Sequence, residues 1–143
     1  MSSRRPLHLR WTAIALVVLG GALGTLVRYL LSLAIPEWHG MPLGIFVINV
    51  TGAFALGWLL EVLARGGPDE GGRRTVRLLV GTGVLGGYTT YSTFAVDTDG
   101  LLLAAQVGPS ALYGLATVLV GAAASVAGLA VGAAVSRRRR GVR

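Results

Sequence analysis

Four long apolar stretches dominate the sequence. They cover residues 11–35, 42–64, 76–105 and 109–135, and 53% of the 143 residues are hydrophobic whereas only 13% are charged. Soluble domains usually contain about 25% charged residues, and a membrane-spanning helix needs roughly 20 apolar residues. We therefore predict an all-α, polytopic membrane protein, in which residues 1–143 form a single domain of four transmembrane helices.

The segments outside these stretches are too short for a catalytic or nucleotide-binding domain. No glycine-rich phosphate-binding motif follows a strand pattern, and the chain has no cysteine. The two histidines, His8 and His39, have no partners at metal-ligand spacing. We therefore expect neither an enzyme nor transport driven by an ATPase within this chain.

The positive charge lies on one side of the predicted spans. All basic residues are arginines, and the net charge is +7. Twelve of the thirteen lie in the N-terminal tail, around the connection between the second and third spans, or in the C-terminal tail: Arg4, Arg5, Arg10, Arg65, Arg73, Arg74, Arg77, Arg137, Arg138, Arg139, Arg140 and Arg143. The two other connections have none. Positive residues stay in the cytoplasm, so we predict a cell-membrane protein with both termini cytoplasmic.

This distribution explains the charge better than a nucleic-acid partner does, and we expect no nucleic acid to bind. The partner is membrane lipid, whose anionic headgroups attract basic clusters such as the run 137–140.

Arg28 is the one arginine within an apolar stretch. A charge there costs about 2.5 to 3.5 kcal/mol on insertion scales. Two interpretations stay open: the side chain snorkels to the far interface, or it faces a water-filled vestibule and attracts anions. Because this embedded charge is positive, a cation carrier built around a central carboxylate is disfavoured.

The third apolar stretch differs from an ordinary lipid-facing helix. Gly86 and Gly87 weaken the helix, and the run 89–93 that follows is rich in hydroxyls that can satisfy freed backbone groups. We predict a broken helix whose exposed carbonyls can bind a hard cation such as sodium. The alternative is a kinked, unbroken helix in which serine and threonine bond back to the preceding turn.

Isolated polar residues in the other spans fit the same region. Asn49 is alone in the second span and needs a hydrogen-bond partner, and Tyr113 and Thr117 share a face of the fourth span. Amide and hydroxyl donors, with the ring edges of Tyr91 and Phe94, carry positive partial charge that suits a small anion. The same groups could equally hold helices together.

Glycines four residues apart predict close helix contacts. Gly20 and Gly24 form one such pair, and Gly128 and Gly132 form another. The spacing puts small residues on one face of a membrane helix. It indicates tight packing and names no function.

The order of these motifs resembles a known family. The run 20–29, which ends in Arg-Tyr, and the second-span pattern from Pro42 through Asn49 to Gly57 are similar to the first two helices of the Fluc/CrcB fluoride channels. The run 82–94 is the most specific match, because Gly-Gly, two threonines, an aromatic residue, Ser-Thr and phenylalanine follow in the order of that family.

The resemblance implies an antiparallel dimer with two pores that passively exports cytoplasmic fluoride. It implies a structural sodium ion (Na+) at the dimer centre, which is not transported and is held by the backbone carbonyls of Gly86 and Thr89. Arg28 would lie near a vestibule. By position, the fluoride path would include Asn49, Tyr91, Phe94, Ser92, Thr93, Tyr113 and Thr117.

Three positions depart from the family pattern. Tyr91 stands where phenylalanine is usual, Ile45 replaces a threonine, and Gly121 lies where a hydroxyl is expected. These departures put the working of one of the two pores in doubt.

The arginine bias also bears on assembly. An antiparallel homodimer needs a chain that inserts in both directions. Here twelve arginines lie on one side of the predicted spans and none in the connections on the other side, which fixes one orientation. We therefore expect a heterodimer with a related subunit of opposite orientation. The alternative function is a non-conducting or half-active partner subunit of such a channel. A small multidrug exporter is disfavoured, because its first span needs an acid and this one has Arg28.

Overall fold

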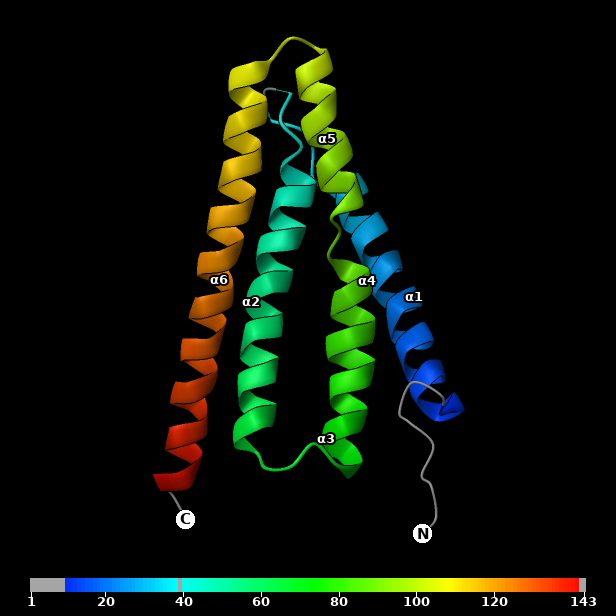
Figure 1. The fold of residues 1–143 in the computed structure, drawn as a ribbon, viewed down its shortest axis with the longest axis vertical. Coiled ribbons are helices and arrows are strands. Elements are labelled where there is room, and N and C mark those ends of the chain that lie inside the picture. Colours follow the sequence, from blue (N-terminus) through cyan, green and yellow to red (C-terminus); the bar gives the residue numbers. More distant parts are fainter. Residues whose placement is uncertain (1–9, 39, 142–143) are drawn as a thin grey trace.

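The computed structural model describes residues 10–38 and 40–141, with side chains up to Arg137. This part of the chain is helical and contains no β-strand, which confirms the all-α class (Figure 1). The helices are α1 (Trp11–Ala34), α2 (Leu43–Arg65), α3 (Gly71–Val76), the π-helix η2 (Arg77–Leu85), α4 (Gly86–Tyr88), α5 (Ser92–Leu103) and α6 (Val107–Gly141).

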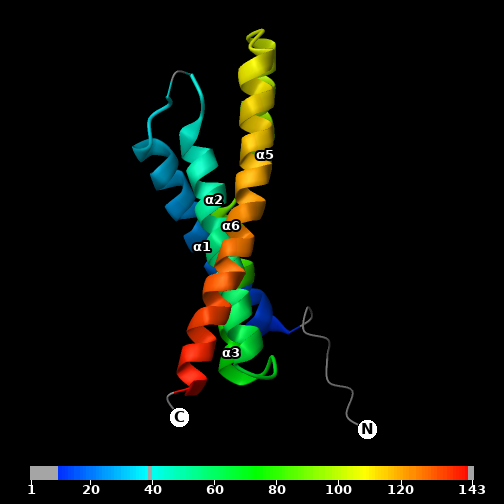
Figure 2. The same cartoon turned by 90° about the vertical axis from the view of Figure 1, so that its left-hand side faces the viewer.

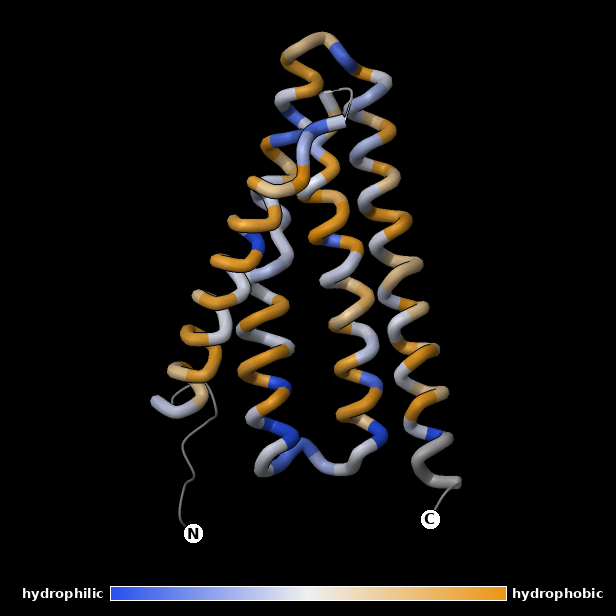
Figure 3. Tube along the Cα trace, turned by 180° about the vertical axis from the view of Figure 1, so that it is seen from behind, coloured by the Kyte–Doolittle hydropathy of each residue, from blue (hydrophilic) through white to orange (hydrophobic). Residues whose placement is uncertain are grey.

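Three helices are long and apolar enough to cross a membrane. Among the described residues these are α1, α2 and α6, the last over Val107–Arg137. The third predicted span is divided among shorter helices, so a count of four spans stays a prediction. Hydrophobic residues run along all the long helices (Figure 3), and large ones are exposed, among them Leu19, Leu33, Leu119 and Val126. The chain is a membrane protein.

The helices form two pairs, which the third segment connects. α2 lies along α6, and α1 lies along η2 and α4 (Figures 1 and 2). Beyond the break, α5 packs on α6. The third segment therefore leaves one neighbour and joins another at the point where its helix is interrupted.

The glycine pairs let helix backbones touch within the chain. A Cβ at Gly24 would overlap the carbonyl oxygen of Val84 in η2. A Cβ at Gly128 would likewise overlap the carbonyl oxygen of Phe54 in α2. Both contacts agree with the close packing that the four-residue spacing predicts.

The break lies just beyond the glycine pair that we expected to cause it. Gly86 and Gly87 are helical in α4, and residues 89–91 leave the helix, with Thr89 extended (φ −78°, ψ 155°). Gly87 serves a different purpose, since a Cβ there would overlap the carbonyl oxygen of Gly21 in α1. The π-helix η2 was not predicted from the sequence, and this rare form often marks functional sites.

The described arginines outside α1 gather at one end of the bundle. α1 begins and α6 ends at this end, where the connection from α2 to α3 also lies (Figure 1). Arg65 pairs with Glu61, and Arg77 with Asp69. The remaining residues of the arginine and histidine predictions, Arg4, Arg5, His8, His39, Arg143 and the side chains of Arg138, Arg139 and Arg140, lie outside the described residues.

Candidate functional site

Asn49 in α2 holds the backbone of Thr90 at the break. Its Nδ2 donates to the Thr90 carbonyl at 2.9 Å, and the Thr90 N–H donates to Asn49 Oδ1, also at 2.9 Å. The predicted need of Asn49 for a partner is confirmed. Both backbone groups of the buried Thr90 are satisfied, and the second hydrogen of the Asn49 NH2 group is not used in this pair.

Two backbone N–H groups near the break donate to side chains. In a continuous helix, the Thr90 N–H would donate to the carbonyl of Gly86, and the Thr93 N–H to that of Thr89. They donate instead to Asn49 Oδ1 and, at 3.2 Å, to Thr90 Oγ1. The carbonyls of Gly86 and Thr89 therefore lose their helical donors. No three carboxylate or histidine side chains gather as a metal site in the described part of the chain.

Three hydroxyls gather where α5 begins. Thr90 Oγ1 lies 3.2 Å from Ser92 Oγ and 3.2 Å from Thr93 Oγ1. Ser92 is exposed, Thr93 is half-buried and Thr90 is buried. The cluster therefore reaches from the interior of the chain to its surface.

Three aromatic rings lie in series next to these hydroxyls. The ring centroids of Tyr91 and Phe94 are 6.0 Å apart, and those of Phe94 and Tyr113 are 5.6 Å apart. Tyr91 is 80% exposed, whereas Tyr113 in α6 is 3% exposed. The Tyr113 hydroxyl donates to Asp97 Oδ2 at 3.4 Å. Thr117 is buried and donates to the Tyr113 carbonyl at 2.7 Å, so its hydrogen serves its own helix.

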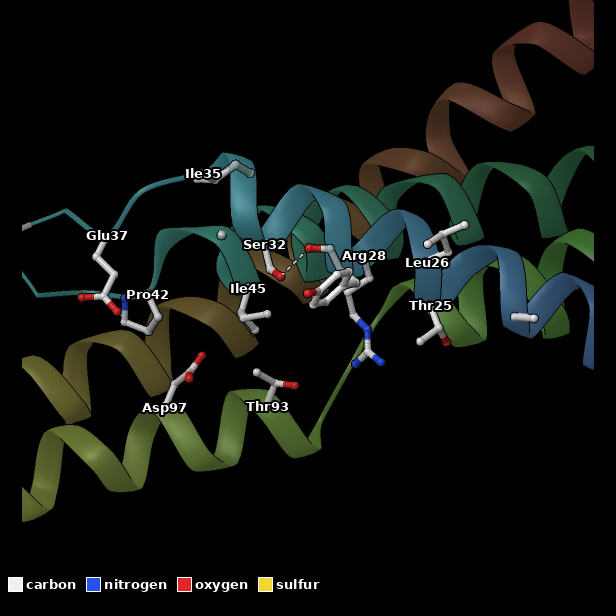
Figure 4. Close-up of a pocket in the computed structure, with 13 residues that line it drawn as sticks. Thr25, Leu26, Arg28, Ser32, Ile35, Glu37, Pro42, Ile45, Thr93 and Asp97 are labelled. Atoms are coloured by element: carbon white, nitrogen blue, oxygen red, sulfur yellow. Dashed lines mark hydrogen bonds between the residues drawn. The ribbon is translucent and has the colours of Figure 1, made fainter.

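Arg28 lines an open cavity between α1, α2 and α5. The cavity has a volume of about 690 Å³, and Ile45, Thr93 and Asp97 also line it (Figure 4). The Arg28 side chain reaches from α1 toward the segment that leads into α5 (Figure 4). None of the ion pairs or hydrogen bonds found among the described residues involves Arg28.

The departures from the family pattern have distinct surroundings. Ile45 is buried and places an apolar side chain at the cavity wall. A Cβ at Gly121 would have no atom within 4 Å, so this glycine leaves open space on α6. Because isoleucine and glycine have no hydroxyl, neither position supplies the donor that the family pattern has there.

One contact, between Asn49 and Thr90, and one residue, Asp97, were missed from the sequence. Thr90 connects Asn49 to the hydroxyl cluster, but Asn49 and Thr90 are 41 positions apart and their spacing predicts no contact. Asp97 could have been found, because it lies four residues after Thr93 and three after Phe94 and so shares their face of α5.

Comparison with known proteins decides the family. Residues 15–129 match the family described as CrcB-like protein, Camphor Resistance (CrcB). The chain belongs to this family. It is 60% identical to the fluoride-specific ion channel FluC 2 of Leifsonia xyli subsp. xyli, over 94% of this chain and 92% of that one.

Two further relatives agree with this assignment. FluC 1 of Cutibacterium acnes is 46% identical over 78% of this chain and 76% of its own length. FluC of Agrobacterium fabrum is 41% identical over 83% of this chain and 94% of its own length. Both are named as fluoride-specific ion channels, and this CrcB family member is not an enzyme.

Proposed function

We propose that this chain is a subunit of a fluoride-selective channel, which passively exports cytoplasmic fluoride and so lowers its toxicity. The observation that carries the proposal is the ring series from Tyr91 through Phe94 to Tyr113, next to the hydroxyls at the start of α5. Ring edges and hydroxyl hydrogens carry partial positive charge. They can replace the water around a small anion without binding it too tightly to leave. The relatives' names support fluoride as this anion.

Two further groups fit an anion path. Arg28 supplies a positive charge on the opposite side of the open cavity from Glu37 and Asp97, which also line it (Figure 4), and attracts anions to that side. The unused hydrogen of the Asn49 amide offers one more donor at the break. Thr93 lines the cavity and belongs to the hydroxyl cluster, so it connects the cavity with the rings.

A structural sodium ion is part of the proposal. Sodium is a hard cation that suits carbonyl oxygens at a helix break. The carbonyls of Gly86 and Thr89 have lost their helical donors, which frees them to be ligands. A Cβ at Gly86 would have no atom within 4 Å, so a second subunit can approach this surface and supply further carbonyls.

The proposed assembly is an antiparallel dimer with four spans in each chain and both termini of this chain in the cytoplasm. The third span would be the broken segment from α3 to α5. The arginine bias supports a heterodimer with a related subunit of opposite orientation. The exposed ring of Tyr91 supports a pathway completed by another chain.

A half-active or non-conducting partner subunit is the second candidate. Ile45 favours it, because a buried apolar side chain lines the cavity where the family pattern has a hydroxyl. In that case the Phe94→Leu substitution in this chain alone would leave the flux of the heterodimer unchanged. If this chain contributes a working pore, the same substitution lowers the flux.

Fluoride efflux from liposomes tests the main proposal. The vesicles would contain this chain alone or together with a related subunit of opposite arginine bias. We expect fluoride efflux from the mixed preparation and little chloride efflux. Absence of fluoride flux in both preparations would refute the channel, and flux from a stable dimer of this chain alone would refute the heterodimer.

A further inference from the structure

Thr51 in α2 and Tyr88 at the end of α4 form a hydrogen bond that the proposed anion path does not use. Their hydroxyl oxygens are 2.9 Å apart. Thr51 Oγ1 also lies 2.7 Å from the carbonyl oxygen of Val47 and 3.1 Å from that of Ile48. A threonine hydroxyl has one hydrogen and a carbonyl can only accept, so this hydrogen goes to the α2 backbone. Tyr88 is therefore the donor to Thr51.

α2 contacts three consecutive residues at the break. In addition to the hydrogen bond from the Tyr88 hydroxyl, Gly52 of α2 lies against the Tyr88 ring, since a Cβ at Gly52 would be 3.1 Å from Tyr88 Cδ1. The same Cβ would overlap the Thr89 methyl group. Asn49 holds both backbone groups of Thr90. The end of α4 is therefore fixed to α2 on both sides of Thr89.

We propose that the Thr51–Tyr88 pair positions the carbonyls of Gly86 and Thr89 for sodium. Tyr88 lies between these two residues, so a rotation at the end of α4 would turn the Gly86 carbonyl within the helix and displace the adjoining Thr89 carbonyl. The hydrogen bond to α2 resists this rotation. Tyr88 and Thr51 are thus positioning residues, which act on the ion through the backbone. The inference rests on the sodium site of the proposed function.

The test measures sodium binding through thermal stability. The midpoint of thermal unfolding (Tm) of the assembled channel is recorded while sodium replaces N-methylglucamine at constant ionic strength. Tyr88→Phe removes the donor and Thr51→Val removes the acceptor, with little change of shape. Each should raise about fivefold the sodium concentration that is needed for a given rise in Tm, as loss of one neutral hydrogen bond predicts. The double variant should show no further shift.

Two control variants separate positioning from general stability. Thr51→Ser keeps the hydroxyl and should restore the sodium response of the unchanged protein. Thr75→Val removes a threonine hydroxyl that donates to the carbonyl of Gly71 at 3.2 Å, away from the break, and should leave the response unchanged. If Tyr88→Phe does not assemble, Thr51→Val decides the matter, and failure of both to assemble would assign the pair to folding and overturn the inference.

The remaining outcomes distinguish this inference from the channel proposal. An unchanged sodium response in Tyr88→Phe would show that the pair only satisfies two hydroxyls, which refutes positioning. Absence of any sodium-dependent Tm rise in the unchanged protein would refute both the sodium site and the inference. Absence of fluoride flux with a normal, Tyr88-dependent sodium response would refute the channel alone and support the positioning role.

Discussion

The two halves of the third segment contact their neighbours in different ways. Before the break, η2 and α4 meet α1 at glycines: the positions of Gly24 and Gly87 leave no space for a Cβ against the facing backbone. After the break, α5 meets α6 through side chains, with the Phe94 ring against Tyr113. Polar contacts add to this second interface, where Ser110 Oγ donates to the Thr98 carbonyl at 2.8 Å.

The first half of the third segment therefore has mainly a structural contact with α1, and the second half presents the groups that can interact with an ion. Backbones in direct contact leave no room for an ion or for water between α1 and the first half, so this interface can only hold the two helices together. The second half offers rings and hydroxyls next to an open cavity. The change of neighbour at the break lets one segment combine a rigid contact with a polar surface.

The largest effect should come from the first half. Gly24→Ala would place a Cβ on the carbonyl oxygen of Val84, and neither backbone can move without separating α1 from η2. We expect a loss of about 3 kcal/mol or more, seen as loss of monodisperse protein on size-exclusion chromatography. Gly21→Ala is the matched control, because a Cβ at Gly21 would be 4.0 Å from its nearest neighbour, the Gly83 carbonyl oxygen. Equal yields of both variants would contradict the support role.

The next effect should come from the junction of the halves. Asn49→Ala leaves the buried N–H and carbonyl of Thr90 without partners, which should cost about 2 to 4 kcal/mol and lower fluoride flux at least roughly tenfold. Asn49→Asp keeps the acceptor for the Thr90 N–H but loses the donor. Its carboxylate would also face the Thr90 carbonyl oxygen and carry a charge within the span, so its stability should be no higher than that of Asn49→Ala and its flux should stay low. Thermal unfolding and liposome efflux measure both, and flux of Asn49→Ala near that of the unchanged protein would contradict the prediction.

A smaller and more selective effect should come from the second half. Phe94→Leu keeps an apolar side chain but removes the ring edges between Tyr91 and Tyr113, so flux should fall about tenfold while stability changes by less than about 1.5 kcal/mol. Tyr91→Phe removes a hydroxyl from a side chain that is 80% exposed and keeps the ring. Its flux should stay within about threefold. Similar losses in both variants would show that the Tyr91 hydroxyl matters as much as the Phe94 ring.

Part of this architecture could be predicted from local sequence. Apolar length places α1 at Trp11–Ala34, close to the predicted 11–35, and α2 at Leu43–Arg65, close to 42–64. The isolated Asn49 correctly indicated a hydrogen bond to another segment, which is partly buried. Both features depend on the polarity of a few neighbouring residues, and this polarity can be read from the sequence without knowing any long-range contact.

Other features depend on residues far apart in the chain. The break follows Tyr88 because Asn49 binds the backbone of Thr90, while Gly87, which precedes it, packs against α1. The π-helix η2 has no signature within an apolar stretch. α6 continues past the predicted residue 135 to Gly141, and arginine, which follows in the run 137–140, is a good helix former.

The smallest effect should lie outside both halves, where η2 begins. Arg77 donates to Asp69 from Nε at 2.9 Å and from Nη2 at 2.7 Å, and this pair lowers the pKa of Asp69 from its usual 3.8. A carboxylate whose pKa is lower in the folded state stabilises the fold above the unfolded value and loses this contribution as pH falls through the folded one. Between about pH 5 and about pH 2, Tm should therefore fall slightly more for the unchanged protein than for Asp69→Asn. The pair is exposed and screened, so the difference should be small, and it should shrink further in high salt. Equal acid sensitivity of the two proteins would show that the Asp69–Arg77 pair does not hold the first half in place. The glycine contacts of the first half with α1 would then be sufficient.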